Sequence, residues 1–276
     1  ITSVGIDVTF NQYKGEIELI TDWKEGDEAV ELYNMISFSD YCPGLIEEEA
    51  KEQLENTKNR ALAKQAINIK DINIILSTDA VKDMMGFYLT HSSARAKYEE
   101  IATAKVGELF QGEGTTGDLV NMKLNPFMKN SPDSALYDND GVALGRHTLY
   151  ENGVLKKYHG SVQFASYLDI EPTGSIHNIE VKGGAIPYGD FKKDPYIEIL
   201  TFSDFQMDNM TGDFGGEIRL AIYFDGKNEI PITGASLSAN LFEVQKEFYL
   251  SKEITQKGSY MGPKALMYKN GSISGE

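Results

Sequence analysis

Histidine is the side chain that most often combines metal binding with acid–base chemistry near neutral pH, and the chain contains four of them. They are His91, His147, His159 and His177. No two stand four or five positions apart and none is followed by glutamate, so the sequence lacks the paired histidines that hold zinc on one helix face. The last three fall in or near one stretch. A hydrolase that gathers them with carboxylates such as Asp169 or Glu171 around a metal therefore stays an open alternative.

The composition narrows the classes of partner and compartment. The single cysteine, Cys42, excludes an internal disulfide and a cysteine-rich metal site and fits a reducing compartment, so we expect a cytoplasmic protein. The 276 residues carry 42 acidic and 26 basic side chains, and the formal net charge of −16 would repel a phosphate backbone. No apolar run is long enough to cross a membrane. We therefore expect neither a nucleic-acid nor a membrane partner.

Residues 137–174 contain the strongest turn signals of the chain. Asp138-Asn139-Asp140-Gly141 opens the stretch, and Glu151-Asn152-Gly153 separates Thr148-Leu149-Tyr150 from Val154-Leu155. Because Asn-Gly readily adopts the positive φ angles of a two-residue turn, this pattern predicts a β-hairpin. Residues 162–168 are apolar enough to be buried, and Pro172-Thr173-Gly174 ends that segment.

The order of these motifs resembles the TldD/PmbA family, once called modulators of DNA gyrase and now regarded as a two-subunit metallopeptidase. The resemblance rests on the acidic turn, on Glu151-Asn152-Gly153-Val154-Leu155-Lys156 and on Glu171-Pro172-Thr173-Gly174. A second block follows in the family's order: Thr211-Gly212-Asp213-Phe214-Gly215-Gly216, then Ala221-Ile222-Tyr223-Phe224-Asp225-Gly226-Lys227 and Pro231-Ile232-Thr233-Gly234. The resemblance covers residues 72–275.

The resemblance also implies where zinc would bind in catalytic members. There, the strand and helix corresponding to residues 72–90 carry His-Glu-x-x-x-His, and a cysteine before the last strand is the third ligand. Here residues 80–89 read AVKDMMGFYL, and residues 251–261 contain no cysteine. The resemblance thus points to the PmbA branch, also called TldE, which lacks the metal motif and pairs with a zinc-bearing subunit. We expect no catalytic residue, metal ligand or cofactor in this chain, with zinc in the partner.

These points predict a non-catalytic subunit of a TldD/TldE-like cytoplasmic metallopeptidase that processes or degrades unfolded peptides. An extended peptide would pair with an exposed strand edge while the TldD-like partner supplies zinc. The residues expected at the substrate channel or partner interface are Thr211, Gly212, Asp213, Phe214, Gly215 and Gly216, with Glu151, Asn152, Gly153, Pro172, Thr173 and Gly174. A tight structural turn explains residues 211–216 equally well. A homodimeric peptide-binding or structural module without a protease partner is a further alternative.

Hydrophobic periodicity places the elements of the first half. Alternating apolar residues from Val4 to Phe10 and at Ile17 and Leu19 predict two antiparallel strands around Tyr13-Lys14-Gly15. Residues 45–67 are predicted to form a surface helix and residues 72–76 a buried strand. Residues 79–90 are predicted to form a core-facing helix capped by Ser77 or Thr78, with a further helix over residues 94–110. The predicted apolar faces are Ile46, Ala50, Leu54 and Leu62 in the first helix, and Val81, Met84, Met85, Tyr88 and Leu89 in the core-facing one.

The second half is predicted to be rich in β-strands, over residues 179–181, 196–202, 217–224, 248–250 and 266–268. Residues 236–244 read as a helix or an irregular bridge. The fold class is therefore α+β: residues 1–118 form the C-terminal part of an α/β N-terminal domain, and residues 119–276 form a β-rich C-terminal domain. Because Ile1 is not an initiator methionine and the apolar alternation begins at once, we expect the chain to be a piece of a longer protein.

Overall fold

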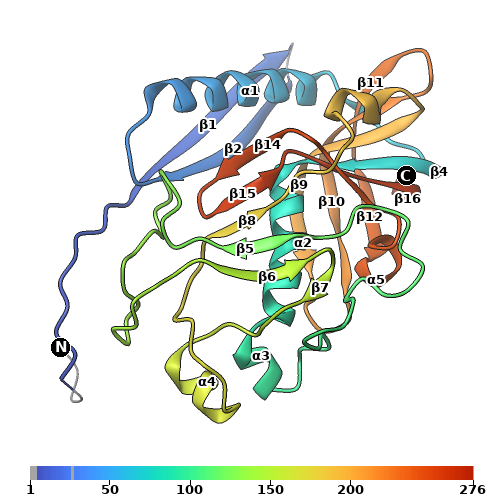
Figure 1. The fold of residues 1–276 in the computed structure, drawn as a ribbon. Helices are drawn as coiled ribbons and strands as arrows, with labels where there is room; N and C mark the ends of the chain where they lie inside the picture. The colour runs from blue at the N-terminus through green and yellow to red at the C-terminus, as the bar shows by residue number, and fades with distance from the viewer. Residues whose placement is uncertain (1–4, 26–27, 276) are drawn as a thin grey trace.

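The computed structural model describes residues 5–25 and 28–275, and Figure 1 shows its arrangement. The helical elements are α1 (Pro43–Ala61), α2 (Thr78–His91), α3 (Ala94–Tyr98), α4 (Val162–Tyr167), the 3-10 helix η1 (Tyr188–Lys192) and α5 (Leu241–Val244). The strands are β1 (Gly15–Glu25), β2 (Glu28–Phe38), β3 (Lys64–Gln65), β4 (Ile69–Leu76), β5 (Met122–Leu124), β6 (His147–Glu151), β7 (Val154–Leu155), β8 (Ile179–Val181), β9 (Tyr196–Met207), β10 (Asp213–Phe224), β11 (Glu229–Thr233), β12 (Ala235–Asn240), β13 (Tyr249–Leu250), β14 (Ile254–Lys257), β15 (Tyr260–Pro263) and β16 (Leu266–Gly275). The predicted α+β class is confirmed.

The strands form three sheets. The largest has the order β12-β16-β4-β9-β10-β11-β3, with β13 on β16, and β12 also pairs with β10, so five of its strands close into a ring. A second sheet has the order β14-β15-β8-β5-β6-β7, and β1 pairs with β2 in a separate hairpin. Strand β4 is parallel to β9 and antiparallel to β16. The boundary expected at residues 118/119 stays a prediction. It would divide the large sheet, which joins β3 and β4 to strands from the second half.

The core lies around α2, between the two larger sheets (Figure 1). Its side chains Val81, Met84, Met85, Phe87 and Tyr88 are all fully buried. The predicted strand 72–76 and helix 79–90 are therefore confirmed, and the i, i+3, i+4, i+7 periodicity correctly identified the inward face. Burial of side chains of this size is the main stabilising term of such a core, at about 1.5–3 kcal/mol each.

The first predicted hairpin is wrong in position. Val4 lies outside the described residues, and residues 5–14 form no strand. That segment lies against the loop before β6, where Gln12 Nε2 donates to the Pro132 carbonyl oxygen at 2.9 Å. The real hairpin pairs β1 with β2, opening on Gly15 opposite Phe38. The alternation at Ile17 and Leu19 therefore identified part of β1, whereas the alternation up to Phe10 does not correspond to a strand.

Helix α1 covers this hairpin, as predicted for a surface helix (Figure 1). It ends at Ala61 and not at residue 67 as predicted, because residues 64–65 form β3. Its predicted apolar stripe is wrong, because Leu54 and Leu62 are 47% and 49% exposed. The buried positions are polar instead. Gln53 Nε2 donates to the carbonyl oxygens of Leu19 and Leu32 at 2.9 and 2.8 Å. Thr57 Oγ1 lies 2.6 Å from the hydroxyl of Thr21 on β1.

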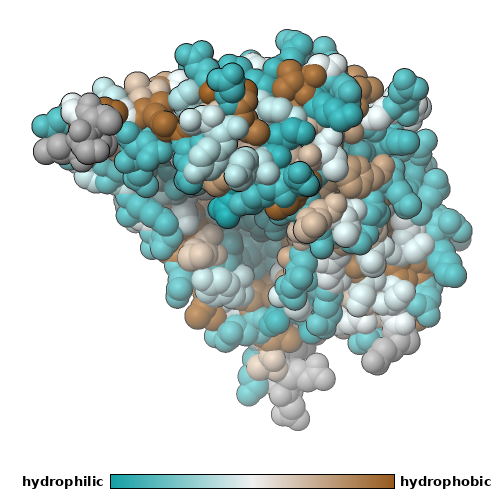
Figure 2. Space-filling model, turned by 90° about the horizontal axis from the view of Figure 1, so that it is seen from below, coloured by the Kyte–Doolittle hydropathy of each residue, from teal (hydrophilic) through white to brown (hydrophobic). Residues whose placement is uncertain are grey.

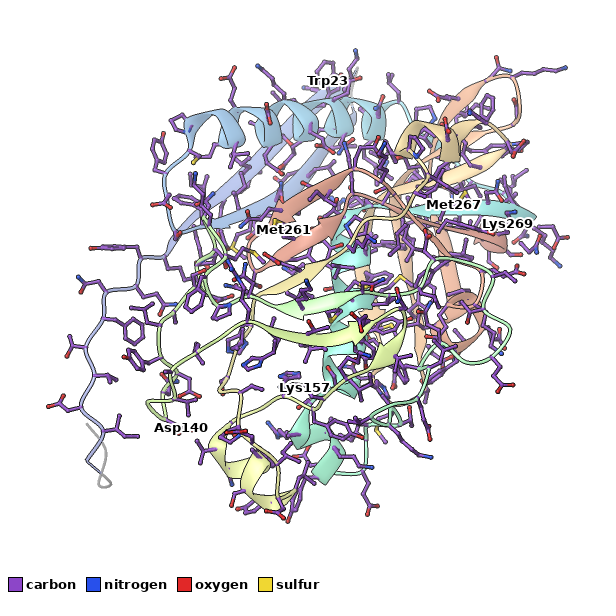
Figure 3. All side chains as sticks on the ribbon, viewed as in Figure 1. Trp23, Asp140, Lys157, Met261, Met267 and Lys269 are labelled. Atoms are coloured by element: carbon purple, nitrogen blue, oxygen red, sulfur yellow. The ribbon has the colours of Figure 1, made fainter. Side chains whose placement is uncertain are left out.

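The outer end of the hairpin is also held to α1 by an aromatic side chain. Trp23 lies beside α1 in Figure 3, and Lys58 Nζ is 6.0 Å from the centroid of its ring. Polar contacts and one cation–π contact thus join the helix and the hairpin into one unit.

Three further expectations are wrong. The helix expected over residues 94–110 ends at Tyr98, because Glu100 adopts a left-handed φ of 61° that ends helical hydrogen bonding. Residues 162–168 were expected to be buried, but residues 162–167 form α4 on the surface, where Val162 and Tyr167 are exposed and the face seen from below is largely hydrophilic (Figure 2). Residues 236–244 form β12 followed by α5, whose first turn is capped when Asn240 Oδ1 accepts from Phe242 N at 3.0 Å.

Candidate functional site

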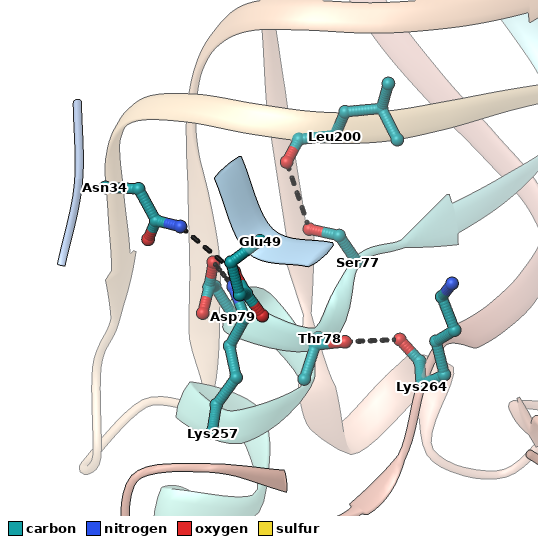
Figure 4. Close-up of polar contacts among 8 residues, drawn as sticks. All are labelled: Asn34, Glu49, Ser77, Thr78, Asp79, Leu200, Lys257 and Lys264. Carbon is teal, nitrogen blue, oxygen red and sulfur yellow. Dashed lines mark hydrogen bonds and ion pairs between the residues drawn. The ribbon is translucent and has the colours of Figure 1, made fainter. Parts of the chain in front are cut away.

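Two hydroxyl side chains at the start of α2 bind backbone groups outside the helix. Ser77 and Thr78 were expected to cap the helix, but neither does so. Ser77 Oγ donates to the Leu200 carbonyl oxygen at 3.3 Å, and Thr78 Oγ1 donates to that of Lys264 at 2.8 Å (Figure 4). The two hydroxyls fix the end of α2 to β9 and to the segment after β15. The exposed side of its first turns, with Asp79 and Asp83, therefore has a fixed place.

The inward face of α2 does not suit zinc. Zinc prefers imidazole, thiolate or carboxylate ligands, and this face presents Val81, Met84, Met85 and Tyr88. The Tyr88 hydroxyl is already used, because it donates to Gln245 Oε1 at 2.8 Å. Within residues 5–25 and 28–275, no three histidine, cysteine or acidic side chains form a group that could hold a metal ion. That this subunit binds no zinc stays a prediction.

His91, in the last turn of α2, is occupied structurally. Thr103 N donates to His91 Nδ1 at 3.0 Å, which places the ring proton on Nε2. His91 Nε2 then donates to the Asn209 carbonyl oxygen at 2.9 Å. Burial lowers the pKa of His91, although the Asn209 bond opposes the effect. The neutral ring thus joins α2 to the turn between β9 and β10.

The other three histidines lie close enough to influence one another. The pKa of His159 is lowered to about 4, chiefly by burial and to a smaller extent by the charges of His177 and His147, while a hydrogen bond to the Leu89 carbonyl oxygen opposes this shift. Burial, and to a smaller extent the charge of Lys157, lowers the pKa of His147. Lys157 lies between the sheet that contains β6 and helix α3 (Figure 3). His159 Nε2 lies 3.1 Å from the Leu89 oxygen, so this nitrogen serves α2 and not a ligand. The alternative of a metal-dependent hydrolase gains no ligand set here.

The Asn-Gly hairpin is confirmed. Asn152 and Gly153, with φ of 48° and 73°, connect β6 to β7. A Cβ at Gly153 would lie 2.6 Å from Leu109 Cδ1, so the glycine is required by both conformation and packing. Glu151 is exposed and forms a 3.0 Å ion pair with Lys156.

The Pro172-Thr173-Gly174 segment is anchored elsewhere. Thr173 is buried, and its Oγ1 accepts from Gly160 N at 3.0 Å. Gly174 has a φ of 76°, and the next amide, that of Ser175, donates to Asp138 Oδ2 at 2.9 Å. The acidic turn at residues 138–141 therefore has a structural task, to hold this segment.

Residues 211–216 form the end of the β9–β10 turn and the start of β10. Thr211 and Asp213 are exposed, whereas Gly212 and Phe214 are buried. A Cβ at Gly215 would clash with the Leu237 carbonyl oxygen, and one at Gly216 would clash with that of Asp204. The close approach that these glycines permit is thus to strands β12 and β9 of the same chain. Each of the three expected segments packs against a different part of the molecule, and their role at an interface or channel stays a prediction.

A cleft that the sequence did not indicate lies between the α1–hairpin unit and the start of α2. Its volume is about 690 Å³, and it is lined by residues 32–38 of β2, by α1, by the first turns of α2, by β9 and by β14. Asn34 Nδ2 donates to Glu49 Oε2 at 3.1 Å on one wall, and Lys257 Nζ pairs with Asp79 Oδ2 at 2.9 Å on the other (Figure 4). Lys257 and Asp79 are 178 positions apart in the chain, so no local motif could have predicted their pairing.

Three strand edges face this cleft. β2 pairs only with β1, and β14 is the end strand of its sheet. β9 pairs with β10 along its length, but its pairing with β4 on the other side ends at Ile199, and its later residues Thr201, Phe202 and Phe205 line the cleft. An open edge presents unpaired backbone donors and acceptors, which is the requirement for adding an extended peptide.

None of the helices in the described residues is long and apolar enough to cross a membrane.

Comparisons with known proteins give one consistent result. The family model of the PmbA/TldA metallopeptidase C-terminal domain matches residues 69–275. An uncharacterized protein of Methanocaldococcus jannaschii is 26% identical over 287 residues, covering 96% of this chain and 64% of that protein.

Solved structures agree with this match. TldE from Thermococcus kodakarensis is similar at a TM-score of 0.78 and 17% identity, over 95% of this chain and 63% of that one. A proposed modulator of DNA gyrase from Thermotoga maritima gives a TM-score of 0.77 and 16% identity, over 95% of this chain and 62% of that one. The chain therefore spans slightly less than two thirds of the length of these relatives.

Proposed function

Because the chain belongs to the PmbA/TldA metallopeptidase family, we propose that it acts as a non-catalytic subunit of a TldD/TldE-like metallopeptidase. The family predicted from its motifs is confirmed. The proposed partner is a TldD-like subunit that carries the zinc, and the proposed substrates are unfolded peptides in the cytoplasm.

The observation that carries this proposal is the inward face of α2. The resemblance places the family's metal motif on this helix, and here its inward positions are fully buried valine, methionine and tyrosine side chains. A helix built in this way stabilises a core and offers no site for activating water. The chain's own contribution is then to bind and orient a peptide, with no chemical step of its own.

The cleft supports the binding part of the proposal. Its open edges on β2, β9 and β14 supply backbone groups that an extended chain could pair with, whatever its sequence. In a folded protein most backbone groups are already bonded to one another, so an unfolded peptide offers many more groups for this pairing. This difference supports the proposed preference for unfolded peptides.

The test is to purify the full-length protein alone and with a zinc-bearing family member carrying His-Glu-x-x-x-His. The expected results are a stable complex in size-exclusion chromatography with light scattering, and peptide cleavage only by the complex. Elemental analysis should find zinc in samples that contain the partner and none in the isolated protein. Stoichiometric zinc together with peptide cleavage by the isolated protein would contradict the proposal. Self-association without binding to any such partner would favour the homodimeric module.

A further inference from the structure

The cleft is acidic on the walls that face each other. Six carboxylates line it, from Asp40, Glu48, Glu49, Glu52, Asp79 and Asp83, against the three ammonium groups of Lys82, Lys257 and Lys264. Lys264 is turned toward the ring of Tyr188, with Nζ 5.4 Å from the ring centroid. The remaining charge favours a cation.

A buried amide in the same cleft points to a hydrogen-bond donor. Gln53 lines the cleft and is 5% exposed. Its Nε2 is used by the carbonyl oxygens of Leu19 and Leu32, which fixes the orientation of the amide. In the described part of the chain its Oε1 has no hydrogen-bond partner. Since an unpaired buried acceptor is costly, a donor entering the cleft would relieve it.

The chain itself places one cation in this environment. The Lys257 side chain, 27% exposed, lies on the edge strand β14 and reaches Asp79 on α2. Partial burial alone would lower the pKa of Lys257. The charges of Asp79, Glu49 and Glu52 together outweigh this effect, so the pKa is raised and the ammonium form is favoured. Carboxylates from α1 and α2 thus act together on one ammonium group (Figure 4).

We propose that this cleft binds extended peptide segments bearing lysine or arginine, and that Lys257 occupies the acidic subsite until such a segment displaces it. The peptide backbone pairs with an open strand edge, and its cationic side chain reaches the carboxylates of α1 and the start of α2. This inference rests on the proposed peptide-binding role and adds the class of peptide. It also assigns Glu49 and Glu52 as residues that determine specificity.

The test measures fluorescence anisotropy of two unfolded peptides that differ only in carrying lysine or glutamate at the same alternate positions. The lysine peptide should bind at least about tenfold more tightly at low salt. The double variant Glu49→Gln with Glu52→Gln should lose about fivefold in affinity for the lysine peptide, as expected for two partly exposed ion pairs. Glu113→Gln with Glu247→Gln makes the same change of net charge outside the cleft and should alter affinity less than twofold.

The proposed displacement of Lys257 has its own test. Lys257→Met should strengthen binding of the lysine peptide several-fold, whereas Lys252→Met, an exposed lysine outside the cleft, should not. Methylating the backbone nitrogens on the pairing side of the peptide should weaken binding, because it removes edge hydrogen bonds.

Equal binding of the two peptides, or equal effects of the cleft and control variants, would overturn the proposal. Complex formation with the zinc-bearing partner is measured on the same Glu49→Gln, Glu52→Gln protein. If that complex forms while charge selection is absent, only this inference fails. If neither the variant nor the natural protein forms the complex, the proposed function fails instead.

Discussion

Acidification should destabilise the protein through His159. Its ring is 9% exposed and lies beneath α2, with Nε2 3.1 Å from the Leu89 oxygen. Its backbone is bonded on both sides, since His159 N donates to Ser92 O at 2.9 Å and Ala94 N donates to His159 O at 2.7 Å. These two bonds fix the backbone of His159, and turning the imidazole to solvent would break its contact with the Leu89 oxygen. Protonating it in place means burying a charge.

The direction and size of the effect follow from the two pKa values. The pKa is 6.5 for an ordinary histidine and about 4 for His159 in the folded protein. As the pH falls below 6.5 the unfolded chain takes up the proton first, so the stability from this residue is fully present above that pH and is lost toward pH 4. Between about pH 7.5 and about pH 5 the loss in unfolding free energy is about 2 kcal/mol.

Urea denaturation of the natural protein and of His159→Gln at these two pH values isolates this contribution. Glutamine keeps an amide donor near the Leu89 oxygen and does not titrate, so the variant should lose about 2 kcal/mol less than the natural protein on acidification. Other titrating groups contribute equally to both proteins and cancel in the difference. If the two proteins lose the same stability over this interval, His159 is not held neutral in the fold and the reasoning is refuted.

Three further changes test the packing around the expected site segments, each by urea denaturation. Gly216→Ala should destabilise the protein by about 1–3 kcal/mol, because its Cβ would strike the Asp204 carbonyl oxygen, and an unchanged midpoint would show that β9 and β10 can separate. Gly86→Ala, in α2 with open space around the added Cβ, should instead stabilise by about 0.5–1 kcal/mol through helix propensity, and any loss would mean that the space is not open. Asp138→Ala removes the acceptor of the Val142 and Ser175 amides, at 2.9 Å each, and should cost about 1–3 kcal/mol. Asp138→Asn keeps one side-chain oxygen that can accept a hydrogen bond, so it should lower the unfolding free energy by less than Asp138→Ala. Equal losses would contradict the role of these hydrogen bonds.

Features encoded by neighbouring residues could be predicted from the sequence. The hairpin at Asn152-Gly153 follows from two residues that tolerate positive φ, and α2 follows from five apolar residues at helical spacing. The family motifs were sufficient for the family itself. Each of these signals consists of runs of neighbouring residues, so no long-range contact had to be known.

Features that depend on tertiary contacts could not be predicted in this way. Gln53 and Thr57 of α1 face inward because they form hydrogen bonds with backbone oxygens of the hairpin and with the Thr21 hydroxyl. Hydropathy alone predicts that such polar residues face solvent. The end of α3 depends on a left-handed φ at Glu100, a residue that rarely adopts it. The cleft joins side chains from α1, α2, β2 and β14, and its central ion pair spans most of the chain.

The two sides of α2 connect the family resemblance to the proposed role. Its inward side is an apolar core face, fully buried at Met84 and Met85, on the helix where the resemblance places the metal motif of catalytic members. Its outward side carries Asp79 and Asp83 into the cleft, where Asp79 already holds an ammonium group. In the proposed role, the inward side of this helix packs the core and its outward side attracts the positive charge of a peptide. On this reasoning, the cleft carboxylates decide which peptides this subunit holds, and the core residues of α2 decide only whether the helix stays in position to present them.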